Sequence, residues 1–226
     1  MFRLIFSPRW FYGIDILFEI FFVFITLLIS FYGYRIYKLS KNKEHKYFSI
    51  SFLLIAISFA FKILTNFDIY FNVFRTMKIG LHTLVLSYLY NSGIIYVTGL
   101  FIYKLLTTLA FFVLLLITTK KHSKNDVYLI VYLIFISTVF SSFTYYIFHI
   151  TLVIILFFLC SYLYNNYEKR KERSKFLVFF SFLMIFLGQF AFMMIFLATE
   201  FYVVGEIFLL AGYSILLYNY LLVSRK

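Results

Sequence analysis

Long apolar stretches separated by short basic segments dominate this chain and leave few folds open to it. Hydrophobic residues make up 64% of its 226 positions and charged residues 13%, whereas an ordinary soluble domain has roughly 45–50% and 25%. A spanning helix needs about 20 mostly apolar residues, because the hydrocarbon core of a bilayer is about 30 Å thick. The sequence therefore predicts an all-α, multi-pass protein of the cell membrane, with the lipid bilayer as its first partner.

Seven spanning helices are predicted within a single transmembrane domain, residues 1–226. Residues 79–90 are apolar, but these 12 residues are too few to span. They predict an interfacial or re-entrant segment that is broken at Asn91-Ser92-Gly93. Residues 127–164 are long enough for two short helices, with a turn near residues 141–149. The predicted spans are residues 14–37, 47–67, 94–118, 127–143, 148–164, 176–197 and 201–223.

Lys and Arg are distributed unequally between the two sides of this predicted bundle. The connections on one side hold 14 of them and those on the other side hold four. Because basic loops face the cytoplasm, we expect the N-terminus outside and the C-terminus inside. An eighth span at residues 79–90 would place eight or more basic residues outside. The net charge of +12 thus reflects membrane topology, and no nucleic-acid partner is expected.

Five polar or charged residues lie at similar depths within the predicted helices. A lysine inside a spanning helix costs roughly 3 kcal/mol unless it reaches the headgroups or meets a partner. Counted from the basic loops at about 1.5 Å per residue, all five fall in the outer third of the membrane. They form a hypothetical buried ionic cluster, or ligand-binding site, in which two cations balance two anions: Glu19, Lys62, Lys104, Gln189 and Glu206. Alternatively, Glu19, Lys62 and Glu206 reach the outer interface separately.

Helical periodicity predicts on which face of each helix the polar residues lie. In the first helix, Asp15, Glu19, Thr26, Ser30 and Gly33 form one stripe at spacings of three, four and seven residues. The second helix has a similar polar stripe at Ser51, Ser58, Lys62 and Thr65, and the last helix has a small-residue face at Gly205 and Gly212. The pattern predicts polar faces that point inward and faces of Phe, Leu and Ile that point outward.

Several activities need residues that this chain lacks. Its single cysteine, Cys160, excludes an intramolecular disulfide and a multi-cysteine metal centre. No spacing of the four histidines is typical of a metal site, and each is expected to be solvated or at an interface. A retinal-binding lysine is missing between residues 201 and 224, and no P-loop, Gly-x-Ser-x-Gly or His-Glu-x-x-His motif occurs. We therefore expect no enzymatic activity, no cofactor and no metal.

Two strings, together with the predicted helix count, carry a resemblance to known membrane proteins. These strings are FHITLVIILFFL at residues 148–159 and FYVVGEIFLLAGYSILLYNYLLVSRK at residues 201–226. In this layout the chain resembles prokaryotic seven-helix sensory modules and uncharacterised archaeal seven-helix proteins. The resemblance implies a seven-helix bundle but carries no functional residue over. Unlike those receptors, the chain stops where an output domain would begin.

A sensor-like or accessory function follows as the leading expectation. No segment outside the predicted spans exceeds 26 residues, so there is no room for a kinase, cyclase or DNA-binding domain. Any signal would leave through a membrane or cytoplasmic protein partner. The alternatives are a small transporter or ion-coupled carrier, and a purely structural membrane subunit. An odd number of helices without an internal repeat differs from the paired repeats usual in carriers.

Overall fold

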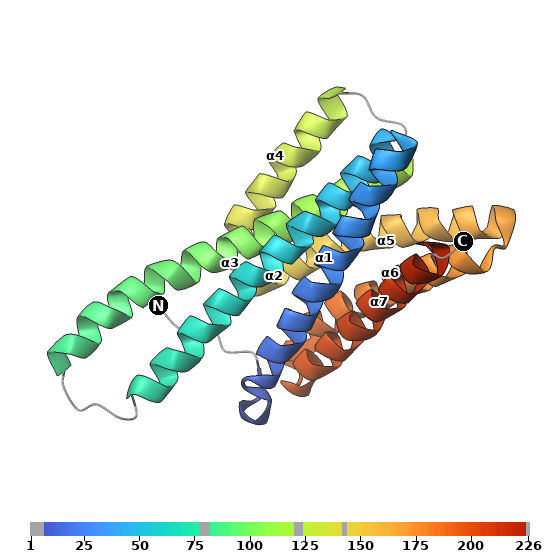
Figure 1. The fold of residues 1–226 in the computed structure, drawn as a ribbon. Helices are drawn as coiled ribbons and strands as arrows, with labels where there is room; N and C mark the ends of the chain where they lie inside the picture. The colour runs from blue at the N-terminus through green and yellow to red at the C-terminus, as the bar shows by residue number, and fades with distance from the viewer. Residues whose placement is uncertain (1–6, 77–81, 120–123, 142–143, 225–226) are drawn as a thin grey trace.

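A bundle of long helices makes up the computed structural model (Figure 1). It describes residues 7–76, 82–119, 124–141 and 144–224, with residues 9, 68–76, 82–95, 124–126, 129 and 224 described by their backbone alone. Every regular element in these ranges is helical, which confirms the all-α prediction. The elements are η1 (Arg9–Phe11), α1 (Ile14–Ser40), α2 (Lys43–Thr76), α3 (His82–Thr119), α4 (Lys124–Ser141), α5 (Tyr145–Arg170), α6 (Arg173–Met193), η2 (Met194–Phe196) and α7 (Glu200–Ser224).

Six of these helices are long and apolar enough to cross a membrane, judged by length and composition, and α4 contains a shorter apolar helix, Ile130–Ser141. Successive helices pack side by side, and α7 returns against α1 so that the first and last helices are neighbours. Helix α4 lies at the edge of the bundle against α3 and α5 (Figure 1). The fold and composition together indicate a multi-pass membrane protein.

The region between the second and third predicted spans differs from expectation. Helix α2 continues to Thr76, and α3 runs without interruption from His82. The predicted break at Asn91-Ser92-Gly93 is therefore wrong, and the described part of the predicted interfacial segment is the first part of α3. Gly in a helix costs only about 1 kcal/mol relative to Ala, so these three residues need not end a long helix. Residues 79–81 of the predicted segment lie outside the described residues.

The other predicted boundaries are shifted by a few residues. Helix α5 begins at Tyr145 rather than at residue 148, and α6 ends at Met193 and is followed by the short helix η2. Thr199 lies in the turn before α7, and Glu200 is the first residue of that helix. Such ends shift easily because the terminal turn of a helix frays.

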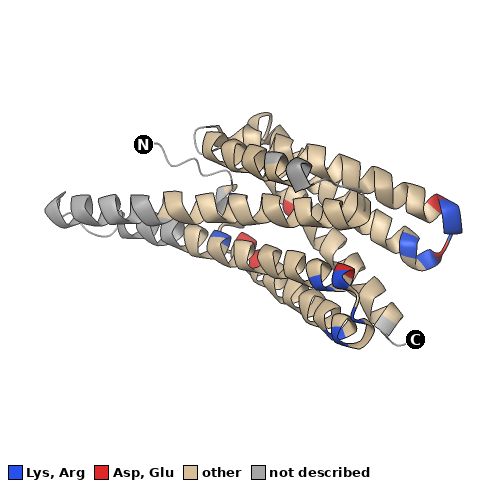
Figure 2. Ribbon diagram, turned by 90° about the horizontal axis from the view of Figure 1, so that it is seen from above, with Lys and Arg blue, Asp and Glu red and all other residues tan. Residues whose placement is uncertain are grey.

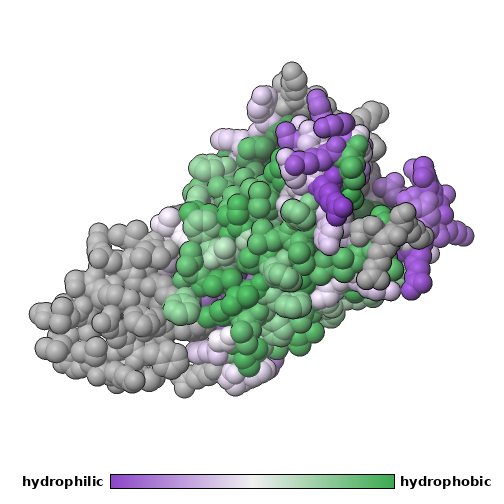
Figure 3. Space-filling view, in the orientation of Figure 1, coloured by the Kyte–Doolittle hydropathy of each residue, from purple (hydrophilic) through white to green (hydrophobic). Residues whose placement is uncertain are grey.

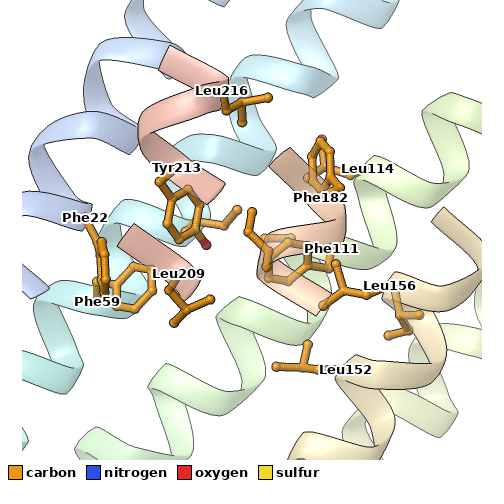
Figure 4. Close-up of a cluster of buried hydrophobic side chains, with 14 of the residues drawn as sticks. Phe22, Phe59, Phe111, Leu114, Leu152, Leu156, Phe182, Leu209, Tyr213 and Leu216 are labelled. Atoms are coloured by element: carbon orange, nitrogen blue, oxygen red, sulfur yellow. The ribbon is translucent and has the colours of Figure 1, made fainter. Parts of the chain in front are cut away.

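Apolar side chains form both the core and the outer surface of the bundle. Rings and branched side chains from several helices meet in the interior (Figure 4), and Phe22, Phe59 and Tyr213 lie with ring centroids 5.1 to 5.9 Å apart. The outer surface is also hydrophobic over a broad band (Figure 3), where Leu17 and Phe31 are about two-thirds exposed. A surface of this kind is compatible with lipid.

Polar side chains occupy the inward faces of the first two helices. The stripe of α1 is buried at all of its predicted positions, namely Asp15, Glu19, Thr26, Ser30 and Gly33. The serines and threonine of the α2 stripe are buried as well. Ser30 donates a hydrogen bond to the carbonyl oxygen of Ser49 at 2.8 Å, which joins α1 to α2. The prediction of polar inward faces on these helices is therefore confirmed.

Basic residues gather at one end of the bundle. The connection between α1 and α2 and the connection between α5 and α6 both lie there, and most of the Lys and Arg residues in view are found at this end (Figure 2). Lys38 and Lys46 place their ammonium groups 5.1 and 6.0 Å from the rings of Tyr34 and Tyr37. We call this region the basic end of the bundle.

Helices α6 and α7 approach each other closely at glycines. A Cβ atom on Gly212 would lie 2.7 Å from Cγ1 of Ile185 and 2.8 Å from the carbonyl oxygen of Ser181. The second contact is with backbone, which cannot rotate away. Small residues at such positions allow helices to pack in lipid, where the hydrophobic effect gives little drive for association.

We predict that Gly212→Ala lowers the thermal midpoint of the purified protein in detergent. Overpacking of this kind typically costs about 1–3 kcal/mol. Ile207→Phe is the control, because it adds a larger group to an exposed face of the same helix. Equal midpoints for Gly212→Ala and the wild type would contradict the close α6–α7 contact.

Candidate functional site

Helix α2 carries a lysine on its inward face, away from the basic end. Ser58 and Thr65, which share the predicted polar stripe with Lys62, are fully buried, and the side chain of Lys62 is 12% exposed. The long lysine stem allows the ammonium group to reach neighbouring helices. Lys62 therefore meets partners inside the bundle rather than at its surface.

Two carboxylates from different helices hold this ammonium group. Nζ of Lys62 lies 3.0 Å from Oε1 of Glu19 on α1 and 2.8 Å from Oε1 of Glu206 on α7. Both glutamate side chains are completely buried. We call Glu19, Lys62 and Glu206 the ionic triad. Because the partners of Lys62 come from both ends of the sequence, the triad joins α1, α2 and α7.

The two carboxylates are only partly satisfied. Asn66, one turn after Lys62, donates from Nδ2 to Oε1 of Glu19 at 2.7 Å. Within the part of the chain that the structure describes, the second oxygen of each glutamate, Oε2, is buried without a hydrogen-bond partner. Buried polar atoms are normally bonded, so each exception calls for an explanation. With one cation and two anions, the triad carries a formal charge of −1 when all three groups are ionised.

Aromatic rings from three helices surround the ammonium group of Lys62. Its Nζ lies 5.8 Å from the ring centroid of Tyr103 on α3, 5.9 Å from that of Phe192 on α6 and 5.7 Å from that of Tyr202 on α7. A cation within about 6 Å of a ring face is attracted by its electrons. The site thus combines two carboxylates with three rings, a chemistry that suits a compact ammonium ion.

Lys104 does not join this group, although it was predicted to share it. Its Nζ donates to the carbonyl oxygen of Ser141, the last residue of α4, at 2.7 Å. It also lies 5.9 Å from the ring of Phe148. Cations are favourable at helix C-termini, where carbonyl groups lack helical partners. Lys104 therefore links α3 to α4 by a hydrogen bond. The predicted cluster of two cations and two anions is not present among the ion pairs described.

Gln189 pairs with a histidine instead of with the charged residues. Nδ1 of His149 on α5 and Oε1 of Gln189 on α6 lie 2.9 Å apart, so the imidazole donates to the amide oxygen. His149 is only 4% exposed. The prediction that every histidine is solvated or at an interface is therefore wrong for His149. Phe192 lies near both groups, with its ring 5.3 Å from that of His149 and 5.9 Å from Nζ of Lys62.

The structure therefore brings together three of the five predicted site residues, the ionic triad, and places Lys104 and Gln189 in separate contacts. Asn66, His149 and the three rings were not among the predicted site residues. Asn66 follows Lys62 by four residues, a helical spacing that places both on one face. The rings gave no signal, because aromatic residues make up 25% of the chain. Within the described residues, no group of three or more His, Cys, Asp or Glu is placed to hold a metal ion.

No protein-family model, curated protein or solved structure matches this chain.

We predict that Lys62→Met lowers the stability of the protein by about 3–5 kcal/mol, because it leaves two buried carboxylates without their cation. Thermal unfolding in detergent measures the effect. The matched control is Lys175→Met, which removes a partly exposed lysine 3.3 Å from the exposed Glu172 and should cost no more than about 1 kcal/mol.

Neutralising all three residues of the triad shows whether the loss of stability in Lys62→Met comes from lost charge balance or from lost packing. The triple variant Glu19→Gln, Lys62→Met and Glu206→Gln should regain most of the stability lost in Lys62→Met, since no unpaired charge remains. A triple variant as unstable as the single one would show that the charges do not govern this site.

Proposed function

We propose that this chain is a seven-helix protein of the cell membrane that acts as a sensor-like or accessory subunit through a protein partner. The observation that carries the proposal is the ionic triad, which links the first, second and last helices at a distance from the basic end. A receptor-like function needs two distinct sites, one that responds to a signal and one that passes it on. The triad and the basic end have this arrangement.

The path of the chain supports α4 as the seventh span. Ser58 accepts a hydrogen bond from Thr107 at 3.0 Å, and Lys62 lies near Tyr103, so α2 and α3 are antiparallel and α3 ends toward the basic end. Helix α5 begins at the opposite end, where the ring of Tyr146 lies 6.0 Å from that of Phe196. Helix α4 connects these two ends. Its 18 residues extend about 27 Å at 1.5 Å per residue, close to the thickness of a membrane core.

The basic end supports an orientation with the C-terminus in the cytoplasm. It holds the lysines that flank the α1–α2 connection and the exposed run of Lys169, Arg170 and Lys171. Positively charged loops favour the cytoplasmic side. The same groups suit contact with an acidic surface of a membrane or cytoplasmic protein. The triad then lies in the outer half of the membrane.

Cysteine labelling tests the orientation. Cys160 is the single cysteine and is buried, so Cys160→Ala provides a cysteine-free background. In intact cells, a membrane-impermeant thiol reagent should label Thr199→Cys and should label Asn42→Cys and Glu172→Cys only after the membrane is opened. All three positions are exposed in the bundle. Labelling of Asn42→Cys in intact cells would reverse the proposed orientation.

Co-purification in mild detergent tests the accessory function. We expect a partner protein to be recovered with the wild type at constant stoichiometry, and recovery to fall when Lys169, Arg170 and Lys171 are all replaced by Gln. Glu200→Gln, at the other end of the bundle, is the control and should leave recovery unchanged.

Ion flux distinguishes the carrier alternative. The purified chain in liposomes is expected to carry no flux of H⁺, Na⁺ or K⁺ down an imposed gradient, as followed with ion-sensitive dyes. Flux by the isolated protein that is lost in Lys62→Met would contradict the accessory proposal and favour a carrier.

A further inference from the structure

We propose that the ionic triad binds one proton, held between the carboxyl groups of Glu19 and Glu206, so that the cluster is neutral when the proton is bound. The inference depends on the proposed membrane bundle but not on the identity of any protein partner. It assigns a ligand to the two carboxylate oxygens that the described residues leave unbonded.

The triad has one more negative group than positive groups. The three groups have a formal charge of −1 when ionised, and both glutamates are completely buried. An uncompensated charge away from water costs several kcal/mol, and a carboxyl group in this situation commonly takes up a proton instead. One proton removes the excess charge and leaves Lys62 paired with one carboxylate.

The positions of the two carboxyl groups also favour a bound proton. Both Oε1 atoms lie within 3.0 Å of the same ammonium nitrogen, so the two carboxyl groups are neighbours. Their Oε1 atoms are occupied by Lys62 and Asn66, whereas the buried Oε2 atoms have no described partner. A proton bound to one Oε2 gives the cluster an acidic O–H donor and leaves the Oε2 of the other carboxylate as an acceptor.

Among the residues whose side chains the structure describes, the surrounding charged and titratable groups do not supply the missing positive charge. On α1, Asp15 accepts hydrogen bonds from the backbone N–H groups of Gly13 and Ile16 at 3.0 and 2.9 Å, and a carboxyl group supplies no positive charge. Lys104 on α3 is engaged with Ser141, and His149 on α5 is engaged with Gln189. The remaining neighbours are the hydroxyl groups of Tyr103, Tyr145, Tyr202 and Tyr213, which are not cations, and Phe192 on α6 has no titratable group.

A proton fits this place better than a metal ion. Hard cations take six or more oxygen ligands, and within the described residues no cluster of three or more carboxylate, imidazole or thiol groups is placed to bind one. Lys62 already occupies the space between the carboxylates, and its ammonium would repel a second cation. A proton needs only one oxygen and adds no volume.

Infrared spectroscopy of the purified full-length protein tests the proposal, because a protonated carboxyl group has a carbonyl stretching band that a carboxylate lacks. At neutral pH we expect a band from one protonated carboxyl group in the wild type. Glu19→Gln and Glu206→Gln should each abolish it, because either change leaves one carboxylate for one lysine. Lys62→Met should double it, because two carboxyl groups then lack a cation.

Two controls make the assignment specific. Asp15→Asn should keep the band, and exchange of Na⁺ for K⁺ or choline should leave it unchanged. The proposal is overturned if the wild type has no such band, if the band survives Glu19→Gln or Glu206→Gln, if Asp15→Asn removes it, or if Na⁺ displaces it. Glu19→Gln and Glu206→Gln test whether the band comes from the triad even if Lys62→Met fails to fold. The band reports the carboxyl groups alone, so its absence is distinguishable from a failure to find a protein partner.

Discussion

One ammonium group between two buried carboxylates is the interaction on which the arrangement of this bundle depends. Each of these charges would cost several kcal/mol alone in a low-dielectric interior, so Glu19, Lys62 and Glu206 must reach the same depth and face one another. This requirement sets the register of three helices at once. In this arrangement α7 packs against α1, and Phe22, Phe59 and Tyr213 from the same three helices meet as a packed aromatic group.

Polar contacts have this influence because the remaining surfaces of the helices are so similar. Most of the exposed side chains are Phe, Leu, Ile and Tyr, and lipid solvates such faces about as well as another helix does. Apolar packing alone therefore gives similar free energies for different rotations of one helix about its axis. The hydrogen bonds from Ser30 to Ser49, from Thr107 to Ser58 and between His149 and Gln189 each fix one such rotation.

The sequence predicted positions along each helix, but not which side chains pair between helices. Apolar length predicted the helices, and periodicity predicted the buried stripe of α1, because both are local properties. Distance from the basic loops predicted equal depths of roughly 24 Å for Lys62 and Lys104. Depth does not specify direction around the helix axis, and packing turns Lys104 toward Ser141 of α4 instead of toward the glutamates. Pairings between residues on different helices, such as His149 with Gln189, leave no local pattern at all.

Continuous helices connect the triad to the basic end, so the charge of the triad is linked to the packing of helices that reach that end. Unbroken helix leads from Glu19 to Lys38 along α1 and from Lys62 to Lys46 along α2, about 24–29 Å in each case at 1.5 Å per residue. Coupling between two sites requires an element with two arrangements that both sites influence. The triad has two charge states, with and without the proposed proton. Without the proton both carboxylates attract Lys62, and with it only one carboxylate does. Since these partners lie on α1 and α7, a change of charge state alters how three helices are held together, and two of them end at the same basic connection.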